Sequence, residues 1–172
     1  LVRQAKAAGA NGFVSKPLFR STLYDKINEL VGKESSSIEP EDDYSDLKGL
    51  HILVAEDNDI NWEIISVMLS MYGITADRAE NGRVCVDMMH AAAEGSYALI
   101  FMDIQMPEMD GIEATKYIVE NNLGKVLILT TFDDDELVQQ ALKNGAKGYL
   151  IKNHTPEHLK QMIIHVCKPY YC

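Results

Sequence analysis

Five short apolar segments alternate with five segments of helical periodicity between residues 51 and 166. Short, continuous apolar runs with polar flanks are typical of strands that are buried on both faces of a parallel sheet. The segments between them repeat apolar residues every three or four positions, which predicts amphipathic helices. This alternation predicts an α/β fold, a doubly wound five-stranded parallel sheet with helices on both faces. The expected strands are residues 51–55, 74–79, 98–102, 126–130 and 148–151, and the expected helices are residues 59–72, 82–93, 111–120, 134–144 and 156–166.

An internal repeat precedes this region. Residues 1–31 align without gaps with residues 137–167, and ten of the 31 positions are identical. Each copy has the pattern of a helix end, a Gly-Ala-x-Gly turn, a short apolar strand that ends in Lys, and an amphipathic helix. We therefore expect residues 1–32 to form a helix-strand-helix fragment, an N-terminal β-α unit that duplicates the end of the main domain.

The segment after the first copy is rich in serine and acidic residues, with serines at 35–37 and an acidic run at 41–43. Such a composition offers too little apolar surface to offset the entropy of ordering, so residues 33–48 are predicted to be a linker. The predicted organisation is the fragment 1–32, this linker, a main domain over residues 49–168 and a tail at residues 169–172.

The chain is strongly acidic, with 16 Lys and Arg against 26 Asp and Glu and a formal net charge of −10. This charge opposes attraction to phosphate backbones and anionic lipids, so we expect no nucleic-acid binding by this chain. No apolar run approaches the length of a membrane span, and the N-terminus lacks the features of a signal peptide. Three cysteines without metal-type pairing suit a reducing compartment, so we expect a cytoplasmic location. The missing initiator Met indicates a piece of a longer chain.

Chemically reactive side chains stand at the ends of the predicted strands. Glu56 and Asp57 follow the first strand, Asp103 follows the third, Thr130 ends the fourth and Lys152 follows the fifth. In a doubly wound sheet the carboxyl ends of the strands border the ligand crevice, so these side chains should converge there.

The chemistry of this set points to phosphoryl transfer. Clustered carboxylates repel one another and need a cation, and oxygen ligands without His or Cys favour Mg²⁺, which also binds phosphoryl oxygens. Asp103 would attack phosphorus as the nucleophile. Mg²⁺ and the Lys152 ammonium would offset charge on the transferring oxygens, and the Thr130 hydroxyl would donate a further hydrogen bond.

Each residue also has a simpler explanation. The acidic pair can be a polar approach to a helix, Thr130 an ordinary strand end, and Lys152 a solvated side chain. The combination favours the functional interpretation, because the simpler explanation must account for several independent placements at once.

The motifs resemble the receiver domain of two-component response regulators over residues from about 50 to 167. The acid pair, the Asp, the Thr and the Lys occur in the order of that family with compatible spacing. The resemblance implies the flavodoxin-like receiver fold. The motifs are Val-Ala-Glu56-Asp57-Asn58, the block Met-Asp103-Ile-Gln105-Met-Pro-Glu-Met-Asp-Gly, Leu-Ile-Leu-Thr130 and Gly-Tyr149-Leu-Ile-Lys152.

The resemblance implies that a phosphohistidine donor phosphorylates Asp103. The donor would be a histidine kinase or a histidine phosphotransfer protein. Mg²⁺ would be held by Glu56, Asp57 and Asp103, together with the backbone carbonyl of Gln105.

The resemblance also implies a conformational switch. Thr130 would move toward the phosphoryl group and vacate space for the ring of Tyr149, with Lys152 as the site lysine. Tyr149 fits ordinary packing equally well. Gln105 and Phe132 would lie near the phosphoryl group and affect its hydrolysis.

Two features depart from an ordinary receiver. The front of the main domain resembles receivers of hybrid histidine kinases, whereas its back half resembles regulators with a helix-turn-helix output, and Asn153 replaces the proline that often follows the lysine. Residues 1–31 resemble the last third of an upstream receiver that lacks an acceptor of its own. A natural mosaic and a chimera both explain this combination.

The duplicated unit raises a further hypothesis. Residues 1–32 have the pattern needed to replace residues 148–166 in the sheet of their own chain or of a neighbour, with Lys16 in the place of Lys152. Exchange with a neighbour would give a domain-swapped homodimer.

Three classes of function are compatible with these motifs. The first is a phosphoacceptor switch, which is not an enzyme because it catalyses only its own phosphorylation and dephosphorylation. The second, an aspartyl-nucleophile phosphatase, would carry a second Asp two residues after the first, where this chain has Gln105. The third is an inactive chimeric, scaffold or interaction fragment with a receiver-like fold.

Overall fold

The structure is a computed structural model that describes residues 47–130, 135–152 and 155–167. The chain divides into two units, Leu1–Asp43 and Tyr44–Cys172, and all described residues belong to the second. Several predictions fall outside the described residues: the fragment 1–32, residues 33–46 of the linker, Phe132, Asn153 and the tail 169–172.

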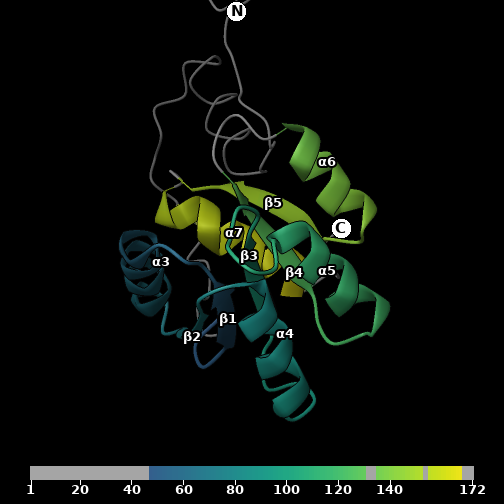
Figure 1. The fold of residues 1–172 in the computed structure, drawn as a ribbon. Helices are drawn as coiled ribbons and strands as arrows, with labels where there is room; N and C mark the ends of the chain where they lie inside the picture. The colour runs from purple at the N-terminus through teal and green to yellow at the C-terminus, as the bar shows by residue number, and fades with distance from the viewer. Residues whose placement is uncertain (1–46, 131–134, 153–154, 168–172) are drawn as a thin grey trace, which may run out of the picture. The chain divides into compact units, whose positions relative to one another are not determined.

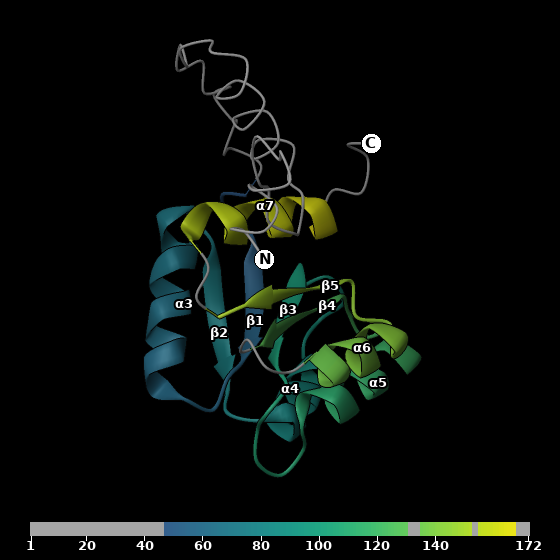
Figure 2. The same ribbon diagram turned by 90° about the horizontal axis from the view of Figure 1, so that it is seen from above.

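Five parallel strands form one sheet in the order β2-β1-β3-β4-β5. The sheet twists from one edge to the other (Figure 2), as parallel sheets of L-residues do. The prediction of a doubly wound five-stranded α/β fold is confirmed. The strands are β1 (His51–Ala55), β2 (Thr75–Ala79), β3 (Leu99–Asp103), β4 (Val126–Thr130) and β5 (Gly148–Ile151).

Helices cover both faces of the sheet (Figures 1 and 2). On one face lie α3 (Asp59–Met71) and α7 (Pro156–Cys167), which contact each other. On the other face α4 (Gly82–Ala91), α5 (Gly111–Glu120) and α6 (Asp135–Lys143) pack side by side. The observed bounds equal the predicted ones for β1, α5, β4 and β5, and the other elements differ by at most two residues at an end, the amount by which fraying termini commonly vary.

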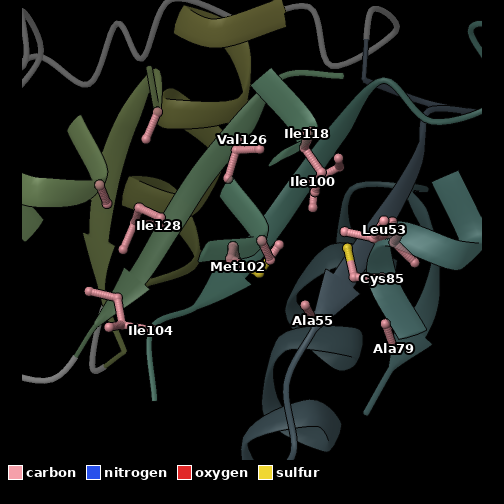
Figure 3. Close-up of a cluster of buried hydrophobic side chains, with 14 of the residues drawn as sticks. Leu53, Ala55, Ala79, Cys85, Ile100, Met102, Ile104, Ile118, Val126 and Ile128 are labelled. Atoms are coloured by element: carbon pink, nitrogen blue, oxygen red, sulfur yellow. The ribbon is translucent and has the colours of Figure 1, made fainter. Parts of the chain in front are cut away.

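The central strands carry the core. Every residue of β3 and β4 is buried, which explains why their sequences are nearly continuous apolar runs. Figure 3 shows side chains from alternate positions, such as Leu53, Ile100 and Ile128, gathered on the face beneath α4, α5 and α6. In β3 and β4 the polar residues Asp103 and Thr130 stand at the carboxyl ends.

The strand order reverses between β1 and β3. These strands are neighbours, yet the chain runs from β1 to β2 on the far side before it returns to β3. Crevices form at such reversals because the two connections leave the sheet on opposite faces. Glu56 and Asp57 follow β1 and Asp103 ends β3, so acidic residues stand on both sides of this reversal.

The chain's own copy of the duplicated unit fills the edge of the sheet. Residues 148–151 form β5 and pair with β4 from Leu127 to Thr130. This arrangement therefore differs from the hypothesis in which residues 1–32 take that place.

Neither a membrane span nor a disulfide occurs in the described part of the chain. None of its helices is long and apolar enough to cross a bilayer. Cys85 and Cys167 are free, and burial raises the pKa of the Cys85 thiol to about 12. Both burial and the raised pKa disfavour the thiolate form of Cys85, which is the reactive form.

Candidate functional site

The acidic pair after β1 splits into one buried and one exposed carboxylate. Glu56 is completely buried, and its Oε1 accepts hydrogen bonds from the Asn58 amide (3.2 Å) and from Asn61 Nδ2 (3.0 Å). Asp57 is exposed. Asn58 also caps α3, its side chain accepting from the amides of Ile60 and Asn61, so the helix start and the Glu56 side chain are fixed together.

Lys152 joins two carboxylates. Asp103, the last residue of β3, is 6% exposed. The Lys152 ammonium lies 2.5 Å from Oδ2 of Asp103 and 2.9 Å from Oε2 of Glu56. The three residues come from the ends of β3, β5 and β1, so the predicted convergence of strand ends occurs for them.

Burial changes the protonation equilibria of this cluster. It raises the pKa of Asp103, and the nearby Glu56 carboxylate adds to the rise, while the hydrogen bond from Lys152 acts in the opposite direction. Burial alone would lower the pKa of Lys152, but hydrogen bonds to Asp103 and Glu56 outweigh it, and the pKa is raised. The site thus holds a charged lysine against an acid that is costly to ionise.

The carboxylates are placed as a cation site requires. Oxygen atoms of Glu56, Asp57 and Asp103 lie within 4.8 Å of one another. A set of hard oxygen donors with excess negative charge fits Mg²⁺, which commonly takes one or two carboxylates and keeps several waters. The backbone amide of Gln105 lies 3.4 Å from Oδ1 of Asp103, so this residue also borders the cluster.

The two predicted switch residues occupy different environments. Thr130 is buried at the end of β4, and its carbonyl accepts a hydrogen bond from the Lys152 amide (2.8 Å). Tyr149 lies on the edge strand β5, opposite Ile128, and is 37% exposed. The structure therefore places Thr130 beside Lys152 and leaves Tyr149 exposed at the border of the sheet.

The loop after β3 fixes the backbone of Asp103. A Cβ on Gly111 would lie 1.9 Å from the Asp103 carbonyl oxygen, so this close approach requires glycine. The Gly111 amide donates to the carbonyl of Ile104 (2.9 Å), and Asp110 caps α5 through the amides of Ile112 and Glu113. The Pro-Glu-Met-Asp-Gly block is thereby a rigid support for the acid.

Sequence reasoning missed two residues of this region, Arg78 and Asn61. Arg78 lies in β2, and its guanidinium contacts Glu56 and Asp57 in the β1–α3 loop and Asp59 at the start of α3. The available signal was an arginine next to the end of a predicted strand, Thr-Ala-Asp-Arg-Ala, because the carboxyl ends of parallel strands meet at one edge of the sheet. Asn61, whose side chain donates to Glu56, was also missed because an asparagine in the first turn of a predicted helix is not a distinctive signal.

Comparison with known families agrees with this geometry. The family model of the response regulator receiver domain matches residues 52–164. The chain belongs to this family. The receiver domain resembles the osmosensing histidine protein kinase SLN1 of Saccharomyces cerevisiae, with 35% identity over 135 residues, covering 75% of this chain and 11% of SLN1. It also resembles the transcriptional regulatory protein YdfI of Bacillus subtilis, with 37% identity over 111 residues, covering 63% of this chain and 50% of YdfI.

Solved structures resemble this receiver domain as well. The chemotaxis protein CheY4 of Vibrio cholerae has a TM-score of 0.61 and 27% identity, covering 68% of this chain and 98% of the matched chain. A co-crystal structure from Saccharomyces cerevisiae, of the histidine phosphotransfer protein Ypd1 and the receiver domain of its response regulator Ssk1, has a TM-score of 0.58 and 29% identity, covering 67% of this chain and 87% of the matched chain. The receiver fold is therefore confirmed, and the chain is a receiver module of two-component signalling. It spans from about a tenth to half of the length of the curated relatives SLN1 and YdfI.

Proposed function

We propose that Asp103 is the phosphoacceptor of this receiver. A carboxylate oxygen of Asp103 forms a bond to phosphorus while the phosphorus–nitrogen bond of a donor phosphohistidine breaks. The leaving imidazole nitrogen keeps the electron pair of that bond and takes up a proton from water. The observation that supports this role is the position of the Lys152 ammonium, which contacts both Asp103 and Glu56. From there it can stabilise the negative charge on the phosphoryl oxygens during transfer.

Glu56, Asp57 and Asp103 would hold Mg²⁺, with the carbonyl of Gln105 as a further ligand. When bound, the ion supplies positive charge to the phosphoryl oxygens. The protein's own contribution is orientation, since Asn58 and Asn61 hold Glu56 in place and Gly111 admits the close packing behind Asp103.

Phosphorylation of Asp103 would cause a conformational change. A phosphoryl oxygen on Asp103 accepts a hydrogen bond from the Thr130 hydroxyl, which draws the end of β4 toward the site. The ring of Tyr149, 37% exposed at the neighbouring edge, then turns inward and changes the surface near α6 and α7. Reversal is hydrolysis, in which water attacks phosphorus, the bond to Asp103 breaks and inorganic phosphate leaves.

The donor would dock along α3, which begins directly after the acidic pair. Four side chains on this helix are apolar and exposed, at a spacing of four, three and four residues, and so form one stripe. A stripe of this kind fits the groove between two helices of a partner, which favours a helical histidine phosphotransfer protein or kinase domain. The stripe consists of Ile60, Ile64, Val67 and Met71.

The remainder of the predicted organisation belongs to the same proposal. Residues 1–32 would be the end of an upstream receiver, joined by the linker 33–48 to the main domain 49–168 and its tail 169–172. Its hybrid-kinase-like front and regulator-like back would act together in the cytoplasm, where cysteines stay reduced. Exchange of the duplicated unit between neighbours would give a swapped dimer, and the net charge of −10 disfavours nucleic acid as a partner.

Intact-mass analysis tests the phosphoacceptor directly. The chain is incubated with Mg²⁺ and phosphoramidate, a small donor with a phosphorus–nitrogen bond, beside the variants Asp103→Asn and Asp87→Asn. Asp87 is an exposed acid of α4 and serves as the matched control. We expect the parent and Asp87→Asn to gain one phosphoryl group and Asp103→Asn to gain none. A parent chain that gains no mass would support the inactive scaffold, and phosphorylated Asp103→Asn would exclude this acceptor.

A further inference from the structure

Arg78 holds the loop that carries the acidic pair. Its Nε donates to the Glu56 carbonyl (2.9 Å), one Nη donates to the Asp57 carbonyl (2.8 Å), and the other donates to Oδ1 of Asp59 (2.6 Å). The side chain of Arg78 is only 19% exposed, whereas that of Asp59 is 86% exposed. The guanidinium is therefore mostly enclosed and bound chiefly to the main chain.

The sheet register explains why this loop needs a support. Val54 pairs with Arg78 and Ala55 with Ala79, and the amide of Glu56 still donates to the Ala79 carbonyl (3.0 Å). The pairing of β1 and β2 ends there, just before Asp57. The fixed fork of the guanidinium then binds two successive carbonyl groups, which a single ammonium does less well.

We propose that Arg78 is a positioning residue that sets the affinity of the receiver for its divalent cation. The inference rests on the cation site of the proposed function. Arg78 contacts the backbone carbonyls of Glu56 and Asp57, so their carboxylates remain available to the cation cluster. Supporting residues of this kind commonly change metal affinity by about 10- to 100-fold when they are removed.

A purely electrostatic role would have the opposite sign. A guanidinium near a cation site repels the cation, so its removal would tighten Mg²⁺ binding if charge alone mattered. Loss of loop positioning weakens binding instead. The direction of the change in affinity therefore separates the two roles.

The experiment compares Mg²⁺ dissociation constants of the parent, Arg78→Ala and Arg78→Lys, measured by fluorescence of Trp62. Trp62 lies in the first turn of α3, where its amide donates to the Asn58 carbonyl (3.0 Å). Arg83→Ala is the matched control, because Arg83 is an exposed arginine in the first turn of α4. Urea denaturation without Mg²⁺ reports separately whether each variant folds.

We expect the dissociation constant to rise about tenfold in Arg78→Ala and about threefold or more in Arg78→Lys, with Arg83→Ala unchanged. The Arg78 variants should require correspondingly more Mg²⁺ to reach half of their maximal rate of phosphorylation by phosphoramidate. At saturating Mg²⁺ their rates should lie within about twofold of the parent rate. Unchanged or tighter Mg²⁺ binding by Arg78→Lys, or by a folded Arg78→Ala, would overturn the proposal. A parent that binds Mg²⁺ but gains no phosphoryl group would overturn the proposed function, while the titration would still decide the role of Arg78.

Discussion

The ammonium of Lys152 lies 2.5 Å from Oδ2 of Asp103, although 49 residues separate them in the chain. The contact joins the end of β3 to the residue after β5, across the intervening strand β4. Glu56 shares the same ammonium at 2.9 Å. The Lys152 ammonium thus neutralises part of a buried acidic cluster. A substitution of any one member should therefore change both the stability of the domain and its affinity for a cation.

Asp103→Asn should stabilise the fold in Mg²⁺-free buffer at pH 7. Because folding raises the pKa of Asp103, its contribution to stability is favourable at low pH and declines as the pH rises through the folded pKa. The amide removes this cost, and Lys152 keeps its contact with Glu56. We expect the free energy of unfolding in urea to rise by about 1 kcal/mol. This gain in stability should vanish below about pH 4, where the Asp103 carboxyl of the parent is protonated in the unfolded state as well. If Asp103→Asn were less stable than the parent at pH 7, the raised pKa of Asp103 in the folded state would be contradicted.

Lys152→Ala should tighten Mg²⁺ binding. The ammonium contacts the same two carboxylates that belong to the cation cluster, so its removal leaves Glu56 and Asp103 with more uncompensated charge. We expect a dissociation constant lower by about three- to tenfold in a Trp62 fluorescence titration at low ionic strength. Lys147→Ala removes an exposed lysine of the same part of the chain and should leave the constant unchanged. Equal affinities of Lys152→Ala and the parent would show that the lysine and the ion do not compete.

Ile64→Glu should impair phosphotransfer from a protein donor but not from phosphoramidate. Ile64 is 46% exposed in the middle of the α3 stripe, so a charge there disturbs docking without entering the core. We expect the rate from a phosphorylated histidine phosphotransfer protein to fall at least about tenfold. Leu142→Glu, at a residue 38% exposed on α6, is the control on the other face of the sheet. A slow rate with both donors would instead indicate damage to the fold or the site.

Thr130→Ala should separate phosphorylation from the switch. The variant keeps Asp103, Lys152 and the acidic pair, so we expect it to gain a phosphoryl group within about tenfold of the parent rate. It lacks the hydroxyl that would pull β4 inward. Fluorine NMR of fluorotyrosine at Tyr149 should report a changed environment on phosphorylation of the parent and no change in Thr130→Ala. A response that survives in the variant would remove Thr130 from the switch.

Gly111→Ala should destabilise the domain by about 3 kcal/mol, because the new Cβ would lie against main-chain atoms that cannot move aside. The conflict is 1.9 Å with the Asp103 carbonyl oxygen. At Gly124 a Cβ would meet only the ends of Ile100 and Met89, at 3.1 and 3.2 Å, and Gly124→Ala should cost less than about 1 kcal/mol. Urea denaturation of the two variants provides the comparison, and equal losses would show that the loop behind Asp103 adapts.

Much of the fold could be predicted from the sequence because β3 and β4 are short continuous apolar runs, which are typical of strands in a sheet covered on both faces. The convergence of Glu56, Asp103 and Lys152 followed from topology alone, since parallel strands end at one edge. The contacts within the cluster did not follow. Which oxygen Lys152 approaches depends on side-chain packing that no sequence pattern encodes.

The finer features depend on register and helix rotation. Arg78 reaches the loop because it pairs with Val54, a one-residue detail of the β1–β2 register. In α3 the helical spacing that predicts the helix includes Ile60, which is 67% exposed, while Leu69 is fully buried. Apolar periodicity alone cannot distinguish a residue that faces the sheet from one that faces a partner.

The placement of Glu56 after the first strand and Lys152 after the last has a consequence for biosynthesis. A ribosome-bound chain that has not yet completed β5 lacks the ammonium that bridges the two acids. The cluster of two carboxylates and one ammonium is therefore complete only when almost the entire domain has been made.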